Sequence, residues 1–212
     1  RLDSMGSSAR LGAGEVLVAE ADESDGSFML LDPTVAIVTN IDPEHLEHWG
    51  SMDALVNGFC DFANKVPFFG FSTLCLDHPV VQSLMPRIRR RVVTYGFNAQ
   101  ADVRGENVHF NGISASVDVR WRDNPMGTLQ LNMPGRHNVS NALAAVAVGL
   151  ELDIPFESIA NGLDGFSGVD RRFSVRAEVD IGGDAPITII DDYGHHPTEI
   201  SATLQAAANA WT

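Results

Sequence analysis

Carboxylates gather in two short segments of this 212-residue chain, each at the end of an apolar run. Ala19–Asp25 (AEADESD) carries four of them, and Asn40–His45 (NIDPEH) carries two beside a histidine. Ligands of open α/β sheets bind outside the carboxyl ends of the strands, so both segments are placed to hold a hard cation or a sugar hydroxyl. A solvated acidic turn is the alternative interpretation of the first segment.

Glu20 and His45 are the pair in these segments that favours a metal site. If the two apolar runs form neighbouring parallel strands, both side chains lie at the same rim of the sheet. A carboxylate and a neutral imidazole can share one divalent cation, and Mg²⁺ keeps waters and takes substrate phosphates as further ligands. A purely structural histidine is the alternative.

Two further segments carry groups that could bind anions. Gly135–Asn141 (GRHNVSN) opens an apolar helical pattern, and such a helix start can receive an anion or the polar edge of a purine. An ordinary capped helix with Asn138 as its N-cap is an equally supported alternative. Arg171 and Arg172 follow a glycine-rich loop, where they could clamp phosphate through bidentate hydrogen bonds or simply be surface charges.

The densest set of ionisable side chains is Asp191–Pro197 (DDYGHHP), with five in one predicted strand-to-helix turn. This density favours a functional site over a structural turn. A phosphate-binding P-loop of the type GxxxxGKS or GxxxxGKT is absent from the sequence. The only lysine, Lys65, lies in FANKVPFFG at the end of an amphipathic helix, so this chain contains no P-loop lysine.

The two carboxylate segments, 19–25 and 40–45, lie in a part of the chain where short β-branched runs alternate with helical patterns. These patterns predict buried, mostly parallel strands and a doubly wound α/β layer with helices on its faces. Ser51 is the expected N-cap of the first long helix. The predicted strands are 15–19, 35–41, 73–76 and 92–95, and the predicted helices are 52–66 and 79–85.

The sequence pattern changes between 101 and 133, where segments of alternating polar and apolar residues, separated by turn residues, predict a small antiparallel β meander. Helices are then predicted at 138–150 and 155–163, followed by a strand at 186–190 and a helix at 197–211. One βα unit cannot bury its own sheet face. We therefore predict one domain over 1–185 and the start of a second over 186–212, with the border near 180–185.

Composition limits the class of partner. Lys and Arg number 14 against 28 Asp and Glu, and this formal charge of −14 argues against nucleic acid or an anionic membrane as the main partner. No apolar run is long enough to span a bilayer and no signal-peptide core is present, so we expect a cytoplasmic protein. Cys60 and Cys75 lie in apolar settings and are expected to be buried thiols. The chain opens on Arg and ends inside a helical pattern, which suggests a piece of a longer protein.

Five motifs in register resemble the Mur ligases: AEADESDGSF, VAIVTNIDPEHLEHWG, MPGRHNVSNALAAVAVG, GVDRRF and DDYGHHPTEI. The resemblance runs from about residue 10 to residue 211. It implies the family's central ATPase domain from just after its P-loop helix, followed by the first βα unit of a Rossmann-like C-terminal domain. The implied activity is ATP-dependent, ADP-forming amide formation through an acyl phosphate in peptidoglycan precursor synthesis. Without the P-loop, we expect the isolated chain to be inactive.

The resemblance also implies residue roles. Glu20 and His45 correspond to Mg²⁺ ligands, with Asn40 near the same site. His137 and Asn141 match positions that contact the adenine of ATP, and Arg172 matches a position that reaches ATP across the domain interface. A further set at the head of the C-terminal domain is expected over the nucleotide and the acceptor, and consists of Asp191, Tyr193 and His195.

The motif details favour the branch of the family whose substrates are UDP-N-acetylmuramate and L-alanine. The nearest alternative is the branch that recycles murein tripeptide, in which two of the motifs read EADEYD and DDFAHHP. A second alternative is a non-catalytic binding module that keeps the fold without the P-loop. The sequence predicts no oligomeric state.

Overall fold

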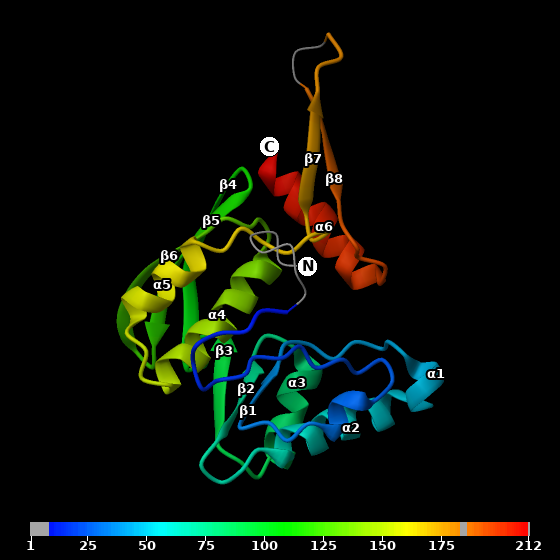
Figure 1. Ribbon diagram of the computed structural model, residues 1–212, viewed down its shortest axis with the longest axis vertical. Helices are drawn as coiled ribbons and strands as arrows, with labels where there is room; N and C mark the ends of the chain where they lie inside the picture. Colours follow the sequence, from blue (N-terminus) through cyan, green and yellow to red (C-terminus); the bar gives the residue numbers. More distant parts are fainter. Residues whose placement is uncertain (1–8, 183–185, 212) are drawn as a thin grey trace.

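The computed structural model describes residues 9–182 and 186–211 of the chain. Figure 1 shows a mixed sheet with helices packed against it, and beside it a long two-stranded hairpin with one helix at its foot. The fold class predicted from the sequence, a mostly parallel α/β sheet with an antiparallel β meander, is confirmed. Within the described residues, no helix is long and apolar enough to cross a membrane.

The main sheet has six strands in the order β1-β2-β3-β4-β5-β6. The first four strands run parallel, and the next two pairings are antiparallel. The predicted meander therefore continues the parallel sheet, because Tyr95 of β3 pairs with Val103 of β4. The strands are β1 Val35–Val38, β2 Phe71–Cys75, β3 Val92–Gly96, β4 Val103–Asn111, β5 Ser114–Trp121 and β6 Asn124–Leu131.

Helices follow the strands much as the apolar spacing predicts. The Ser51 hydroxyl accepts the backbone N–H of Ala54 at 3.1 Å, which confirms the predicted N-cap of α2. Two short 3₁₀ turns, η1 Ser27–Leu30 and η2 Met85–Arg87, were not predicted, and neither was α1. The helices of this part are α1 Leu46–Trp49, α2 Met52–Lys65, α3 Pro79–Leu84, α4 Arg136–Glu151 and α5 Phe156–Asp164.

Two apolar clusters hold the helices to the sheet. Leu143 and Val146 of α4 are fully buried against the middle strands, together with Val117 of β5. Leu55 of α2 packs in a second cluster with Val38 at the end of β1. Both cysteines are buried and free, as expected. The loop that follows β1 therefore starts from a tightly packed base.

The strand predicted at 15–19 is wrong. This segment is extended but pairs with no strand of the described chain, and Val16, Leu17 and Val18 are 70%, 90% and 88% exposed. Its β-branched residues were the basis of the prediction, but β-propensity expresses how well side chains fit a half-buried pleated surface. Without such a surface, the same residues form no strand.

A hairpin and a helix form the last part of the described chain. β7 Ser174–Val179, which the sequence analysis missed, pairs antiparallel with β8 Ile187–Asp191. The helix α6 Pro197–Ala210 then begins with Glu199 in its first turn, as predicted. The proposed domain border at 185/186 falls between the two paired strands, next to residues 183–185, which lie outside the described residues. The division at that point stays a prediction.

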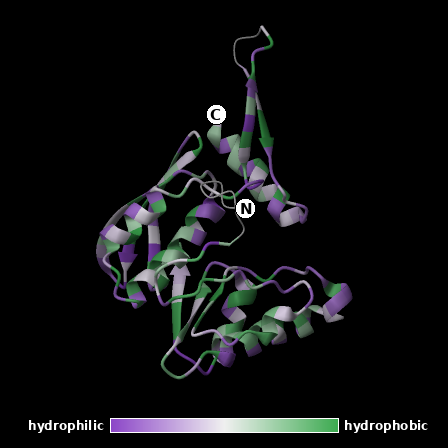
Figure 2. Cartoon of the chain, in the orientation of Figure 1, coloured by the Kyte–Doolittle hydropathy of each residue, from purple (hydrophilic) through white to green (hydrophobic). Residues whose placement is uncertain are grey.

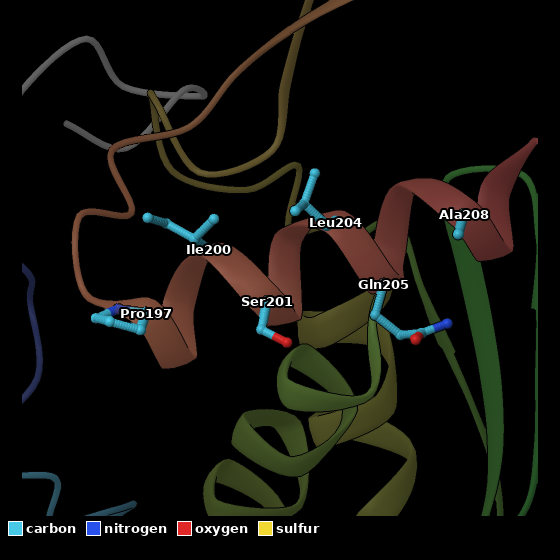
Figure 3. A pocket seen from close by; sticks show the side chains of 6 residues that line it. All are labelled: Pro197, Ile200, Ser201, Leu204, Gln205 and Ala208. Atoms are coloured by element: carbon cyan, nitrogen blue, oxygen red, sulfur yellow. The ribbon is translucent and has the colours of Figure 1, made fainter.

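One face of α6 and both strands of the hairpin expose apolar side chains. Figure 2 shows hydrophobic stretches on the hairpin, where Ile187 and Ile189 are nearly half exposed. An open hollow of about 550 Å³ lies along α6, and Figure 3 shows the side chains that line it. It is lined by Pro197, Ile200, Ser201, Leu204, Gln205 and Ala208.

Candidate functional site

A small cavity of about 150 Å³ lies at the carboxyl end of β1. Polar groups line its mouth, and the apolar side chains of α2 and β1 close its base. The position agrees with the rule that α/β sheets bind ligands beyond the carboxyl ends of their strands. Its lining residues are Ala21, Glu23, Ile37, Val38, Thr39, Asn40, Ile41, Asp42, Glu44, Leu55 and Phe59.

Asn40 has a fixed amide orientation at this cavity. Its side-chain Nδ2 donates to the Asp42 carboxylate at 2.8 Å, and its Oδ1 accepts the Thr39 hydroxyl at 2.9 Å. Both ends of the amide are therefore assigned by their partners. This places a positioned side chain at the rim, where the sequence predicted Asn40 to lie.

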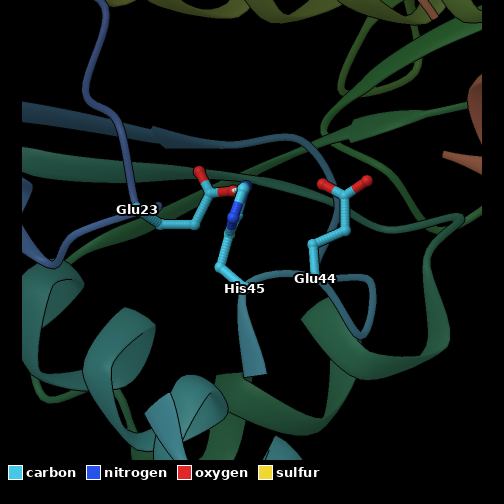
Figure 4. Close-up of side chains that lie close together, drawn as sticks. All are labelled: Glu23, Glu44 and His45. Carbon is cyan, nitrogen blue, oxygen red and sulfur yellow. Dashed lines mark ion pairs between the residues drawn. The ribbon is translucent and has the colours of Figure 1, made fainter. Parts of the chain in front are cut away.

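His45 begins α1 with a left-handed backbone, at φ 52°. Such a conformation is costly for a residue with a side chain, and it is commonly found where a fold needs to aim that side chain. The Nε2 atom lies 3.9 Å from the Glu23 carboxylate. Figure 4 shows His45 and Glu23 facing each other with Glu44 beside them.

Glu23, Glu44 and His45 form a group that could hold a cation, since one ligand atom from each lies within 4.8 Å of the others. Two carboxylates and one imidazole suit a divalent cation that completes its coordination with water and phosphate oxygens. All three residues are half-buried, so the group is open to an incoming ligand on one side. The chemistry of this donor set fits the magnesium site that the motifs implied.

The structure places Glu20 outside this group. Glu20 is exposed and follows the segment that forms no strand. It was expected at the rim because a strand at 15–19 would have ended there, and that strand does not form. Glu23 takes the place beside His45 because the Trp49 indole N–H donates to the Glu23 carbonyl oxygen at 2.9 Å. The sequence signalled a carboxylate in AEADESD, but it could not select among four of them.

The start of α6 meets the loop after β1. One ligand atom each from Glu44, His195 and Glu199 lies within 4.8 Å of the others. The Nδ1 atom of His196 lies 3.5 Å from the Glu44 carboxylate. The structure thus brings His195 close to Glu44, the neighbour of His45 in the sequence, together with the unpredicted residues His196 and Glu199.

Glu199 organises this turn. Its carboxylate accepts the backbone N–H groups of His195 at 3.1 Å and His196 at 3.4 Å, and it accepts from the Arg172 guanidinium at 3.1 Å. Burial raises the pKa of Glu199, but these hydrogen bonds together outweigh it and hold the pKa below its ordinary value. Arg172 is therefore fixed at the head of α6.

The start of α4 differs in one detail from its prediction. Gly135 is the N-cap, at φ 94°, and Asn138 lies inside the helix, where its Nδ2 donates to the Pro134 carbonyl at 2.7 Å. Asn138 cannot cap the helix because the glycine turn begins it three residues earlier. A side chain at Gly135 would meet His137 and Ala206, so α6 packs against this helix start.

His137 has a pKa below its ordinary value. The cause is desolvation by the surrounding atoms, which the Asp192 carboxylate opposes and the Arg172 guanidinium reinforces. A neutral imidazole at this place can donate a hydrogen bond to a purine edge through one ring nitrogen, or accept one through the other. Asn141 is exposed one turn further along α4, as its predicted role of contacting a ligand requires.

Asp191 and Tyr193 face the hairpin. The Asp191 carboxylate accepts from Arg176 at 2.9 Å, and the Tyr193 ring lies under the Arg171 guanidinium, 4.9 Å from it. These two predicted residues are therefore not brought to the His45 rim. The unpredicted Asp192 holds the same turn together, since it accepts the backbone N–H groups of Phe173 and Gly194.

Comparison with known proteins agrees with this architecture. Residues 2–149 match the family model of the Mur ligase middle domain. A UDP-N-acetylmuramate–L-alanine ligase of Anaeromyxobacter dehalogenans is 52% identical over 211 residues, which cover 100% of this chain and 45% of that protein. The chain thus spans about half the length of the curated relatives it matches.

Two solved structures are similar to the fold. The crystal structure of UDP-N-acetylmuramate-alanine ligase from Thermotoga maritima superposes with a TM-score of 0.74 at 28% identity, over 90% of this chain and 42% of that one. A murein peptide ligase from Psychrobacter arcticus gives 0.59 at 25% identity, over 84% and 35%. The family match, the relatives and the mixed sheet with its carboxyl-end site agree: this chain belongs to the Mur ligase family, whose middle domain it contains.

Proposed function

We propose that this chain is part of an ATP-dependent, ADP-forming ligase that joins L-alanine to the muramoyl carboxylate of UDP-N-acetylmuramate. The proposal rests on the group Glu23, Glu44 and His45 that could hold a cation, with His195 near Glu44 and Arg172 bound to Glu199, in a chain that is 52% identical to a ligase of that name. We infer that the enzyme works in the cytoplasm, as a step in the synthesis of peptidoglycan precursors.

The chemistry makes clear demands on these residues. A carboxylate oxygen attacks the γ-phosphorus of ATP and ADP leaves, and then the amine of the amino acid attacks the acyl carbon and phosphate leaves. The first step brings a carboxylate to a polyanion, so positive charge must offset their repulsion. Mg²⁺ supplies part of that charge when it is bound.

The residues of this chain would hold the cation and contact the nucleotide. Glu23, Glu44 and His45 would hold the cation, and the fixed amide of Asn40 lies beside them. Arg172, kept in place by Glu199, would contact the phosphates, while His137 and Asn141 at the start of α4 would receive the adenine. Glu20 keeps its proposed role as a metal ligand only if its segment moves closer to His45. This sequence itself contains no P-loop lysine.

L-alanine rather than murein tripeptide is the proposed amino substrate. The relative reported above adds L-alanine at 52% identity, whereas the murein peptide ligase structure is 25% identical. The motifs EADESD and DDYGHHP support the same choice. The assay measures phosphate release by the full-length parent protein with ATP, UDP-N-acetylmuramate and either L-alanine or tripeptide. Turnover with tripeptide alone would overturn the choice.

The same assay separates an enzyme from a binding module. We expect the full-length parent to release phosphate only when both the sugar nucleotide and the amino acid are present, and the isolated chain to release none. If the full-length parent binds the sugar nucleotide but releases no phosphate with either amino substrate, the chain comes from a binding module.

A further inference from the structure

A pair of exposed aromatic rings lies at the amino edge of the sheet, opposite the site. The loop between α2 and β2 is a tight turn in which the N–H of Gly70 donates to the Pro67 carbonyl at 3.0 Å. Phe68 and Phe69 occupy the two corner positions of this turn and are 90% and 68% exposed. Turn corners normally carry polar or small residues, so two phenylalanines there need a reason.

The two rings form a tip rather than the lining of a groove. Their centroids are 5.3 Å apart and their planes are nearly perpendicular, so each ring contacts mainly the other. A ring that is 90% exposed has almost no neighbours within the chain. In Figure 1 this turn lies at the lower end of the view, at the far side of the sheet from α6. It belongs to no part of the proposed ligase site.

Three exposed arginines follow one another near this tip: Arg87 at the end of η2, then Arg89 and Arg90 in the loop before β3. The Arg87 guanidinium donates to the Asn57 side-chain oxygen of α2 at 2.6 Å. The Arg90 Nε donates to the Val66 carbonyl at 2.7 Å, directly beside the turn. This leaves the two terminal nitrogens of that guanidinium free to bind an anion in a bidentate manner.

These three arginines have no carboxylate partner, a property they share with Arg120 and Arg136 in the described part of the chain. Six other arginines have a carboxylate oxygen within 4.0 Å, namely Arg91, Arg104, Arg122, Arg171, Arg172 and Arg176. Across residues 9–182 and 186–211, no carboxylate oxygen lies within that distance of Arg87, Arg89 or Arg90. Their charge is therefore available to an external anion, although the whole chain carries −14.

We propose that the Phe68–Phe69 turn and Arg87, Arg89 and Arg90 form a peripheral membrane-contact surface for anionic phospholipid. The two rings enter the boundary between headgroups and acyl chains, and the guanidiniums pair with lipid phosphates. Salt screens charges beyond about 8 Å, so the acidic remainder of the molecule does not prevent contact through this tip. Neither an aromatic tip nor a basic cluster alone is enough, because stable interfacial binding takes two signals.

A lipid surface fits better than nucleic acid or a protein. Perpendicular rings give no pair of parallel platforms on which successive bases could stack. A protein partner would need a matching hollow for a convex tip, whereas a bilayer interface accepts it directly. The proposal is independent of the ligase activity.

Vesicle flotation tests the proposal with the purified protein. We expect it to float with vesicles of equal parts phosphatidylglycerol and phosphatidylcholine, and not with phosphatidylcholine alone. Arg89→Gln with Arg90→Gln should weaken binding about 25-fold, at about fivefold for each charge. Phe68→Ser with Phe69→Ser should weaken it at least about tenfold.

Control variants show whether binding depends on the tip itself or only on the overall charge and hydrophobicity of the protein. Gln130→Glu with Gln205→Glu makes the same change in net charge at exposed sites elsewhere, and Leu204→Ser removes an exposed apolar side chain from α6. Both should bind like the parent. Phe68→Trp should show a blue shift of its fluorescence with the anionic vesicles, and Leu204→Trp should show none.

Three results would overturn the proposal. The first is no binding to anionic vesicles, and the second is binding that the control variants weaken as much as the tip variants do. The third is a dependence on Phe68 and Phe69 that appears in binding to polyuridylic acid, or in self-association measured by sedimentation, but not with vesicles.

Discussion

Glu199 is the residue whose loss should most clearly loosen the head of α6. Its carboxylate accepts two backbone N–H groups and one guanidinium, at 3.1–3.4 Å. A capping interaction of this type contributes about 1 kcal/mol, and a half-exposed ion pair contributes less than about 1 kcal/mol. Glu199→Ala should therefore raise the free energy of the native α6 turn by about 2 kcal/mol, which is about a 30-fold increase in local opening.

Glu199→Gln refines this expectation. Glutamine keeps one acceptor oxygen for the backbone N–H groups, but it loses the charge that pairs with Arg172 and with the helix dipole. Its cost should be about 1 kcal/mol, or a fivefold increase in opening. The ordering of alanine above glutamine tests whether the hydrogen bonds to the backbone, and not the charge alone, hold the turn.

Hydrogen exchange measured by mass spectrometry can follow this opening. Peptides from α6 should exchange faster in the two variants, while peptides from the buried face of α4 serve as the internal control. Because the pKa of Glu199 is lowered in the fold, its contribution is present above the unfolded value of 4.5 and is lost as the pH falls through the folded value. The difference between the parent and Glu199→Ala should therefore shrink in acid. Unchanged exchange in α6, or equal acceleration in both helices, would refute the reasoning.

Three further predictions concern the site and the sheet. His45→Ala in the full-length parent should slow acyl phosphate formation at least about 100-fold, as followed by phosphate release in rapid-quench experiments, and near-normal rates at saturating Mg²⁺ would exclude a ligand role. His137 should titrate below 6.5 by NMR, and Arg172→Gln should raise that pKa because it removes a repelling positive charge; no change would contradict the assigned cause. Since protonation of His137 is disfavoured in the fold, its contribution to stability is full above pH 6.5 and falls as the pH drops. Gly96→Ala should lower the free energy of unfolding in urea by about 1–3 kcal/mol, because a side chain at φ 146° would lie 2.5 Å from the Asp77 carboxylate; an unchanged midpoint would contradict that clash.

The elements that depend on local spacing could be predicted from the sequence. The helix predicted at 52–66 and its Ser51 cap are confirmed, because apolar periodicity and a capping side chain act within one turn. β7 was missed although SVRAEV alternates polar and apolar residues; its hairpin with β8 leaves most of its side chains exposed, so no buried face marks the strand.

The membership of the site could be predicted only in part. His45, Asn40, Arg172 and His195 could be proposed because their motifs are distinctive, and their roles stay predictions. The choice of Glu23 over Glu20 depends on the Trp49 hydrogen bond, which joins residues 26 positions apart. The roles of Glu44 and Glu199 depend on α6 packing against the rim, which no local pattern in the sequence reports.

The open edge of β1 has a practical consequence for handling the protein. Within residues 9–182 and 186–211, β1 is hydrogen-bonded to one strand only, β2, and the exposed run Val16–Val18 pairs with no strand. The exposed apolar run of one molecule can pair with the open edge of β1 in another, and so form an intermolecular β-sheet. Aggregation of concentrated samples should therefore begin here, and a charged gatekeeper such as Leu17→Lys should keep the chain dispersed without reaching the site.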